Sequence, residues 1–261
     1  MKKYKYVLAI FVIVFILFST PVMAQEKNEN LAKSKKTACL LIKESYEDKD
    51  GPIEIKMVAF KDLAESLLLY AGLVVVDPES EHCDYTLRIA SSGKALGNFY
   101  SSVSFGQGMY YYTGASVSGT AKIESKNGPA DNISFSANIS PPEEIRVGNQ
   151  RTTPQRAPFK EAFRLSQFTE KMVDMFGNFF GIEFLMNAVN NFERRNAPIR
   201  QRAKSILEDM GDSAIEEMIS LLKCKDETRR RSAWTTLEML TGQYFGSDYD
   251  AWLQWWEVNK S

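Results

Sequence analysis

The sequence has little histidine, little cysteine and almost no net charge. Its 261 residues include one histidine and three cysteines, and 32 basic side chains are balanced by 33 acidic ones. A domain that binds nucleic acid normally carries a basic excess, so we expect no nucleic-acid partner. The single histidine, His82, lies in an acidic turn and has no second pair of ligands at zinc spacing, so we expect no metal and no cofactor. It also builds no Ser-His-Asp or Cys-His arrangement, so we predict that the protein is not an enzyme.

Glycine and proline are also sparse, with 15 and 9 residues. A collagen-like chain would need a glycine period, and a small disulfide scaffold would need many more cysteines. The 44% of hydrophobic residues, together with the small net charge, excludes a disordered chain. The composition therefore indicates an ordinary globular protein of one large or two small domains.

Long hydrophobic runs are confined to the N-terminus. Lysines at positions 2, 3 and 5 precede an apolar run over residues 7–18, and small residues lead to Ala24 before the polar Gln25. This pattern is typical of a secretory signal peptide, residues 1–24. The run is too short for a membrane-spanning helix, and we expect no transmembrane segment in the mature chain. We therefore expect an exported protein, in the periplasm or outside the cell, that begins with a flexible leader over residues 25–36.

Export to an oxidising compartment makes the three cysteines candidates for pairing. Cys39 lies in the first expected strand and Cys83 lies just before a later strand, so a Cys39–Cys83 disulfide is one candidate. The alternative is three buried free thiols. Cys224 has no partner near it in the sequence.

Residues 37–181 alternate between strand and helix patterns. Short or alternating apolar segments predict strands at 38–43, 73–76, 85–89, 115–124 and 133–139, and three- and four-residue apolar spacing predicts helices at 60–71 and 159–180. The last two strands form a hairpin with one polar face. We therefore predict an α+β sandwich domain, an antiparallel sheet with helices on one face.

The segment from Gly72 to Arg88 reads as a helix end, Val-Val-Val-Asp and then Asp-Tyr-Thr-Leu-Arg. This order resembles the small α+β domains of bacterial envelope proteins that assist lipid transport and outer-membrane assembly. The resemblance covers about half the chain and includes no catalytic motif.

Tyrosines at 110, 111 and 112 lie in a stretch rich in glycine and serine. Tyr110, Tyr111 and Tyr112 are candidates for a partner or ligand surface, because tyrosine offers a large contact area at low entropy cost. The alternative is a hairpin whose tyrosines pack on the sheet.

Residues 182–261 predict only helices, with an internal repeat. Arg200, Ala203, Leu207 and Met210 recur as Arg230, Ala233, Leu237 and Leu240, and a glycine follows each segment. This pattern resembles HEAT-type helical repeats, and the resemblance implies a short all-α domain of two helix pairs after the α+β domain. Arg200 and Arg230 belong to a basic cluster that either binds an acidic partner or has a solvated or intra-repeat role.

The C-terminal tail is rich in tryptophan. The order Thr-Gly, Phe-Gly-x-Asp and Trp-x-x-Trp-Trp resembles tails that close HEAT-like modules of secreted bacterial proteins. Trp252, Trp255 and Trp256 share one face of a terminal helix. That face either seals the end of the repeat stack or is an exposed platform for glycan or peptide.

Helical repeats present extended binding surfaces, and no catalytic arrangement competes with this interpretation. We therefore expect a non-catalytic exported protein that binds another protein, an envelope component, in an interaction or assembly role. The alternative is a binder of a small ligand, lipid or glycan that uses the tyrosines or the tryptophans.

Overall fold

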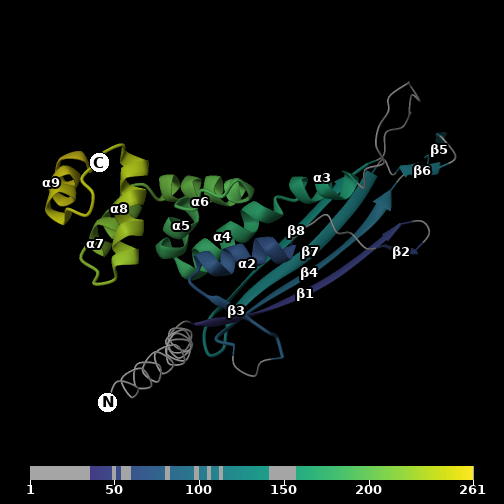
Figure 1. The fold of residues 1–261 in the computed structure, drawn as a ribbon, viewed down its shortest axis with the longest axis horizontal. Coiled ribbons are helices and arrows are strands. Elements are labelled where there is room, and N and C mark those ends of the chain that lie inside the picture. The colour runs from purple at the N-terminus through teal and green to yellow at the C-terminus, as the bar shows by residue number, and fades with distance from the viewer. Residues whose placement is uncertain are drawn as a thin grey trace, which may run out of the picture.

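The computed structural model describes residues 36–48, 51–53, 60–79, 83–96, 100–104, 107–111, 114–140 and 157–260. The predicted signal peptide and nearly all of the predicted leader lie outside these residues. The described chain has an α+β fold, as the sequence predicted: a long twisted sheet with helices on one face, followed by a group of helices at one end (Figure 1). No described helix has the length and apolar character that crossing a membrane requires.

The main sheet has six strands. Their order is β2-β1-β4-β7-β8, and β3 also pairs with β1. The strands are β1 (Thr37–Asp48), β2 (Gly51–Ile53), β3 (Val74–Val76), β4 (Tyr85–Leu96), β7 (Gly114–Ser125) and β8 (Ala130–Ile139). Strands β5 (Tyr100–Ser104) and β6 (Gln107–Tyr111) form a separate two-stranded sheet.

The main sheet is mixed, whereas the sequence predicted an antiparallel one. Residues 38–47 of β1 pair in parallel with residues 85–94 of β4, and β1 also pairs in parallel with β3. Helix α2 (Phe60–Tyr70) connects the β1–β2 segment to β3 and β4, and both of these strands run in the same direction as β1. The pairs β4–β7 and β7–β8 are antiparallel, which confirms the predicted hairpin.

Three helices cover one face of the sheet. Helix α2 packs on β1 and β3, α3 (Ala157–Leu165) on β4, β7 and β8, and α4 (Phe168–Phe180) on β8. The sequence predicted α3 and α4 as one helix, and this was wrong. The chain breaks at Ser166 and Gln167, where Gln167 takes a left-handed backbone with φ 54°. The break directs Phe163 and Phe168 from two different helices onto the same ring of Phe60.

Strand β7 has a glycine, Gly119, at the position where the ring of Phe135 from β8 lies over it. Gly119 is directly opposite Phe135, and a Cβ at position 119 would clash with the Phe135 ring and with the Ala90 carbonyl oxygen. The ring therefore packs on bare backbone, which brings the buried Phe135 close to the sheet.

The last third of the chain is helical, as predicted. It contains α5 (Ile182–Val189), the short 3-10 helix η1 (Arg194–Asn196), α6 (Ala197–Met210), α7 (Asp212–Leu221), α8 (Glu227–Thr241) and α9 (Tyr249–Asn259). Helix α5 packs on α6, α7 packs on α8, and α9 packs on α7. Asp226 and Asp248 accept hydrogen bonds from main-chain N–H groups in the first turns of α8 and α9, so each caps the start of its helix.

One hydrophobic core runs through both parts of the chain. It extends from Ala38 in the sheet to Trp256 in α9, and α4 packs against both α5 and α6. The described residues on the two sides of Gly181 therefore share buried apolar contacts.

Candidate interaction surface

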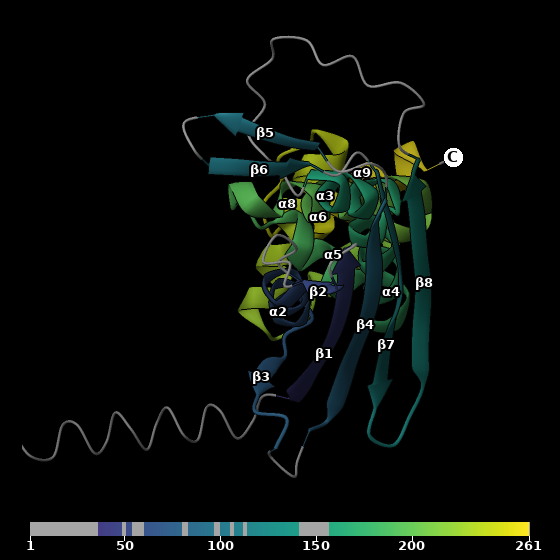
Figure 2. The same cartoon turned by 90° about the vertical axis from the view of Figure 1, so that its right-hand side faces the viewer.

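The face of the sheet directed away from α2, α3 and α4 carries no described helix (Figure 2). Because side chains alternate along a strand, every second residue of β1, β4, β7 and β8 points to this side. We call these residues the uncovered sheet face. They are mostly short and polar or charged: Lys43, Ser45, Glu47, Arg88, Ser92, Lys94, Ser116, Ser118, Thr120, Lys122, Asn132, Ser134, Ser136 and Asn138.

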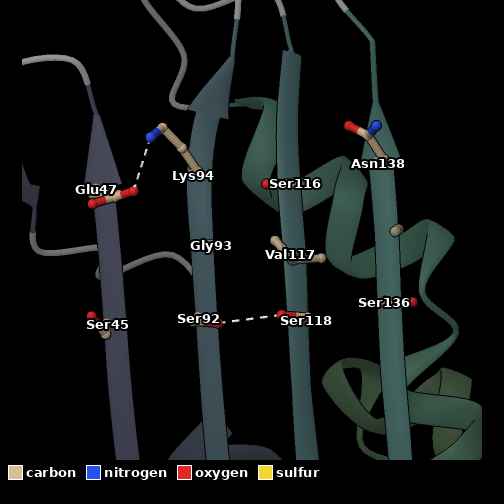
Figure 3. Close-up of a pocket in the computed structure, with 11 residues that line it drawn as sticks. Ser45, Glu47, Ser92, Gly93, Lys94, Ser116, Val117, Ser118, Ser136 and Asn138 are labelled. Atoms are coloured by element: carbon tan, nitrogen blue, oxygen red, sulfur yellow. Dashed lines mark hydrogen bonds and ion pairs between the residues drawn. The ribbon is translucent and has the colours of Figure 1, made fainter.

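Four serines lie in one row across this face. Ser45 is opposite Ser92, Ser92 is opposite Ser118, and Ser118 is opposite Ser136. All four are exposed, and the Oγ atoms of Ser92 and Ser118 are 3.3 Å apart (Figure 3). The serine row is thus a line of hydroxyl groups that runs across four strands.

The neighbouring row carries a charged pair. Lys94 Nζ is 3.2 Å from Glu47 Oε1 on the adjacent strand, and Ser116 and Asn138 continue this row on β7 and β8 (Figure 3). The two rows line an open depression of about 600 Å³. An exposed pair of this kind adds little stability, so its charges remain available to a partner.

At the other end of the uncovered sheet face the side chains are longer and more tightly paired. Arg88 and Lys122 both contact the carboxylate of Glu124, with Lys122 Nζ 2.6 Å from Glu124 Oε2. The disulfide between Cys39 and Cys83 lies beside this group and lines an open depression of about 520 Å³ with it.

The disulfide confirms one of the two alternatives that the sequence left open. The Cα atoms of Cys39 and Cys83 are 5.7 Å apart, and Cys224 is free and half-buried.

Hydrogen bonds to Asp84, next to Cys83, also hold the start of β1. Asp84 Oδ2 accepts hydrogen bonds from Thr37 N at 2.7 Å and Thr37 Oγ1 at 3.2 Å. These bonds, the main-chain one first, lower the pKa of Asp84.

A buried hydroxyl group lies on the opposite, covered face. The Tyr46 hydroxyl is 3.0 Å from both Glu44 Oε1 and Ser91 Oγ, and its ring packs edge-on against Phe159 and Phe163. Burial raises the pKa of Tyr46 and of Glu44. These groups satisfy one another's hydrogen bonds at the margin of the core, which is the usual requirement for a buried hydroxyl.

The structure does not place the C-terminal tryptophans on the surface. Trp252 is 0% exposed, Trp256 is 7% exposed and Trp255 is half-buried. Trp252 Nε1 donates to the Gly246 carbonyl oxygen at 2.8 Å. An open tryptophan platform for glycan or peptide was therefore wrong, because α9 turns its aromatic face onto α7 and the core.

The two repeat arginines bind main-chain carbonyl groups of their own repeats. Arg200 Nη1 donates to Asn191 O at 3.2 Å, and its guanidinium lies over the Phe192 ring. Arg230 Nη1 donates to Cys224 O at 2.7 Å. In both repeats the arginine of the second helix thus binds the segment that follows the first helix. These hydrogen bonds correspond to the intra-repeat role, which was one of the alternatives for the two arginines.

The predicted tyrosine surface is described only in part. Tyr110 and Tyr111 lie in β6, opposite Ser101 and Tyr100 of β5, and Tyr112 lies outside the described residues. Their role as a partner or ligand surface stays a prediction.

Sequence reasoning missed the serine row. Ser116 and Ser118 belong to the predicted polar face of the hairpin, but the row depends on which strands are neighbours and in which register. Ser45 and Ser92 lie opposite each other only because β1 pairs in parallel with β4 in this register.

Comparisons with known proteins add little. No family model and no curated protein matches the chain. A neuraminyllactose-binding hemagglutinin homologue from Helicobacter pylori is similar over 65% of this chain and 91% of its own, with 14% identity and a TM-score of 0.29. Rare lipoprotein B from Shewanella oneidensis is similar over 69% of this chain and 98% of its own, with 12% identity and a TM-score of 0.21. These TM-scores are too low for either likeness to assign a fold or a function.

Proposed function

We propose that this protein is an exported, non-catalytic binding protein, and that its uncovered sheet face docks against another protein of the cell envelope. The observation that carries the proposal is the extent of this face across β1, β4, β7 and β8. Sites for small molecules are usually concave and mostly apolar. The depressions on this face are open and lined largely by serine and charged side chains, which favours an extended partner.

The chemistry of the face favours a polar protein surface as the partner. Short hydroxyl side chains let another main chain approach closely, and the pairs Lys94–Glu47 and Lys122–Glu124 offer charges of both signs. The described outward residues of these four strands include no aromatic ring on which a sugar could stack.

Export is supported by two features at different levels. The basic and apolar start of the chain has the pattern of a signal peptide, although residues 1–24 lie outside the described residues. The Cys39–Cys83 disulfide is a bond that persists mainly in oxidising compartments.

We also propose that α5–α6 and α7–α8 are two HEAT-like repeats. Each is a pair of packed helices, and the second helix of each pair carries the arginine that binds the preceding segment. Two repeats alone bury too little surface to be stable. Helix α4 packs on α5 and α6 at one end and α9 packs on α7 at the other, which supplies the missing neighbours.

The test is crosslinking and affinity capture from the native envelope fraction with two matched variants. The variant S92K/S118E places a favourable charge pair in the middle of the serine row, so bulk is added without like-charge repulsion. The control S213E/S220K makes the same exchanges at two exposed serines of α7.

We expect the wild-type chain and the α7 control to capture the same protein, and S92K/S118E to lose it while folding normally. Equal capture by S92K/S118E, or loss only in the α7 control, contradicts the assignment to the uncovered sheet face.

A further inference from the structure

The two edges of the main sheet differ in whether other strands pair with them. The outer edge of β1 is occupied at one end by β3 and at the other by β2, which contains Pro52. No described strand pairs with the outer edge of β8, which is the last strand in the order. A row of unpaired main-chain N–H and C=O groups is a template for another strand.

The strand β8 has few of the features that protect such an edge. It is ten residues long, and its register with β7 is unbroken over residues 115–124 and 130–139, so no bulge twists the edge away. It contains no proline, lysine or arginine, and Asp131 is its only charged residue. Its inward residues Ile133, Ala137 and Ile139 are only partly buried. An added strand would cover them further.

We propose that β8 is a self-association site, at which two copies of this chain pair their β8 strands antiparallel about a twofold axis through Phe135. This inference concerns the strand edge and stands apart from the proposed docking of a partner on the uncovered sheet face. A twofold contact places the same patch on both copies, so the strand must be complementary to itself.

The sequence of β8 meets that requirement. With the axis through Phe135, Ser134 faces Ser136 of the other copy and Asn132 faces Asn138 of the other copy. These pairs match hydroxyl with hydroxyl and amide with amide on the polar side. On the core side Ile133 faces Ala137 of the other copy, and Asp131 faces Ile139, so no like charges meet.

The pairing would also extend the serine row. Ser136 ends the row within one copy, and Ser134 of the second copy would continue it across the junction. The two main sheets would then form one continuous sheet with both helical layers on the same side, because an axis perpendicular to the sheet keeps each face on its own side.

One side chain now occupies part of this edge. Lys171 of α4 donates from Nζ to the Ser134 carbonyl oxygen at 3.1 Å, and it must leave for a second strand to bind there. Lysine at a strand edge opposes pairing. Replacement of Lys171 by alanine is therefore expected to strengthen self-association.

The first experiment measures the mass of the purified mature chain by sedimentation velocity over a range of concentrations. We expect a dimer for the wild type. In the variant S134K/S136K two pairs of lysines would face each other across the junction. Their repulsion is expected to raise the dissociation constant of the dimer about tenfold or more. The control S118K/T120K adds the same charges to the same face on β7, an interior strand, and is expected to dimerise as the wild type does.

A monomeric wild type at all concentrations overturns the proposal. A dimer that S134K/S136K leaves intact also overturns it, as does equal dissociation by the β7 control. Because no other protein is present, these outcomes are independent of the capture of an envelope partner.

A second experiment tests the register with engineered cysteines in a C224S background. S134C and S136C face each other only across the proposed axis, at a main-chain separation that a disulfide can bridge. A mixture of the two variants is expected to form the crosslinked dimer, and neither variant alone is. Crosslinking of S134C with itself would place the axis at Ser134 and overturn the register.

Discussion

Asn187 and Tyr70 are 117 residues apart in the sequence, and Asn187 Nδ2 donates to the Tyr70 carbonyl oxygen at 2.9 Å. The Oδ1 atom of the same amide accepts from Ser232 Oγ at 3.0 Å, so one side chain joins α2, α5 and α8. Asn196 adds a bond of 2.6 Å to the Tyr70 hydroxyl. The helices on the sheet and the C-terminal helices are thus held by a polar network as well as by the core.

The variant N187A is expected to lower the free energy of unfolding by about 1–3 kcal/mol, because it leaves the Tyr70 carbonyl group and the Ser232 hydroxyl without this partner. Urea unfolding measures the change. N259A removes an exposed amide that bonds only to its own helix, and is expected to change stability by less than about 0.5 kcal/mol. Equal effects of the two variants would contradict a role for the network.

The shared core also predicts one cooperative unfolding transition. All four tryptophans lie in residues 234–256, so their fluorescence reports on the C-terminal helices, whereas far-ultraviolet circular dichroism reports on the whole chain. We expect the two signals to change at the same urea concentration. An earlier fluorescence transition would show that the C-terminal helices unfold on their own.

Removal of the disulfide in C39S/C83S is expected to lower the free energy of unfolding by about 2–4 kcal/mol, since the bond closes a long loop in the unfolded chain. The cysteines are 44 residues apart in the sequence. C224S removes the half-buried free thiol and is the control, with a smaller expected loss. Thermal unfolding without reductant measures both, and equal stability of C39S/C83S and wild type would contradict the prediction.

The tryptophans of α9 are expected to differ in their contribution to stability. W252A is expected to cost about 3–5 kcal/mol, because it removes a fully buried ring and the hydrogen bond to Gly246 O. W255A, at a half-buried position on the same helix, is expected to cost less. Urea unfolding followed by circular dichroism compares them, and a reversed order would mean that α9 packs through another face.

The lowered pKa of Asp84 predicts how stability falls in acid. A carboxyl group whose pKa is lower in the folded chain contributes stability above its unfolded pKa of about 3.9, and this is lost as pH falls through the folded value. D84N keeps an acceptor for Thr37 N but removes the charge. We expect the stability difference between wild type and D84N to shrink below about pH 4. Parallel stability profiles in acid would rule out this contribution.

The sequence predicted many elements correctly because their signals are local. The apolar spacing in α2 predicted the helix, and the glycine after it predicted where the helix ends. Gly72 takes the left-handed backbone, with φ 76°, that is common at such an end. The repeat of Arg200 and Arg230 indicated two helix pairs. The break between α3 and α4 was missed, because the apolar pattern continues across Ser166 and the left-handed backbone falls on Gln167 instead of a glycine.

The candidate site was predicted less well. The most conspicuous aromatic residues, Trp252 and Trp256, were candidates for binding, yet they are core residues. Amphipathic spacing shows that a helix has one apolar face, but it does not show what covers that face. No local sequence pattern predicts the serine row, because its members, such as Ser45 and Ser136, come from strands far apart in the sequence.

The amino-acid sequence by itself determined most of the helices and strands, which face of each is apolar, and that a cysteine pair was available for a disulfide. Tertiary structure alone decided the order and direction of the strands, the uncovered sheet face, the place of β8 at the end of the described strand order and the burial of the tryptophans. The reason is physical. A two-residue period is the same in parallel and antiparallel strands, and hydrophobic burial is non-directional, so the choice of neighbour is made only when the whole chain packs.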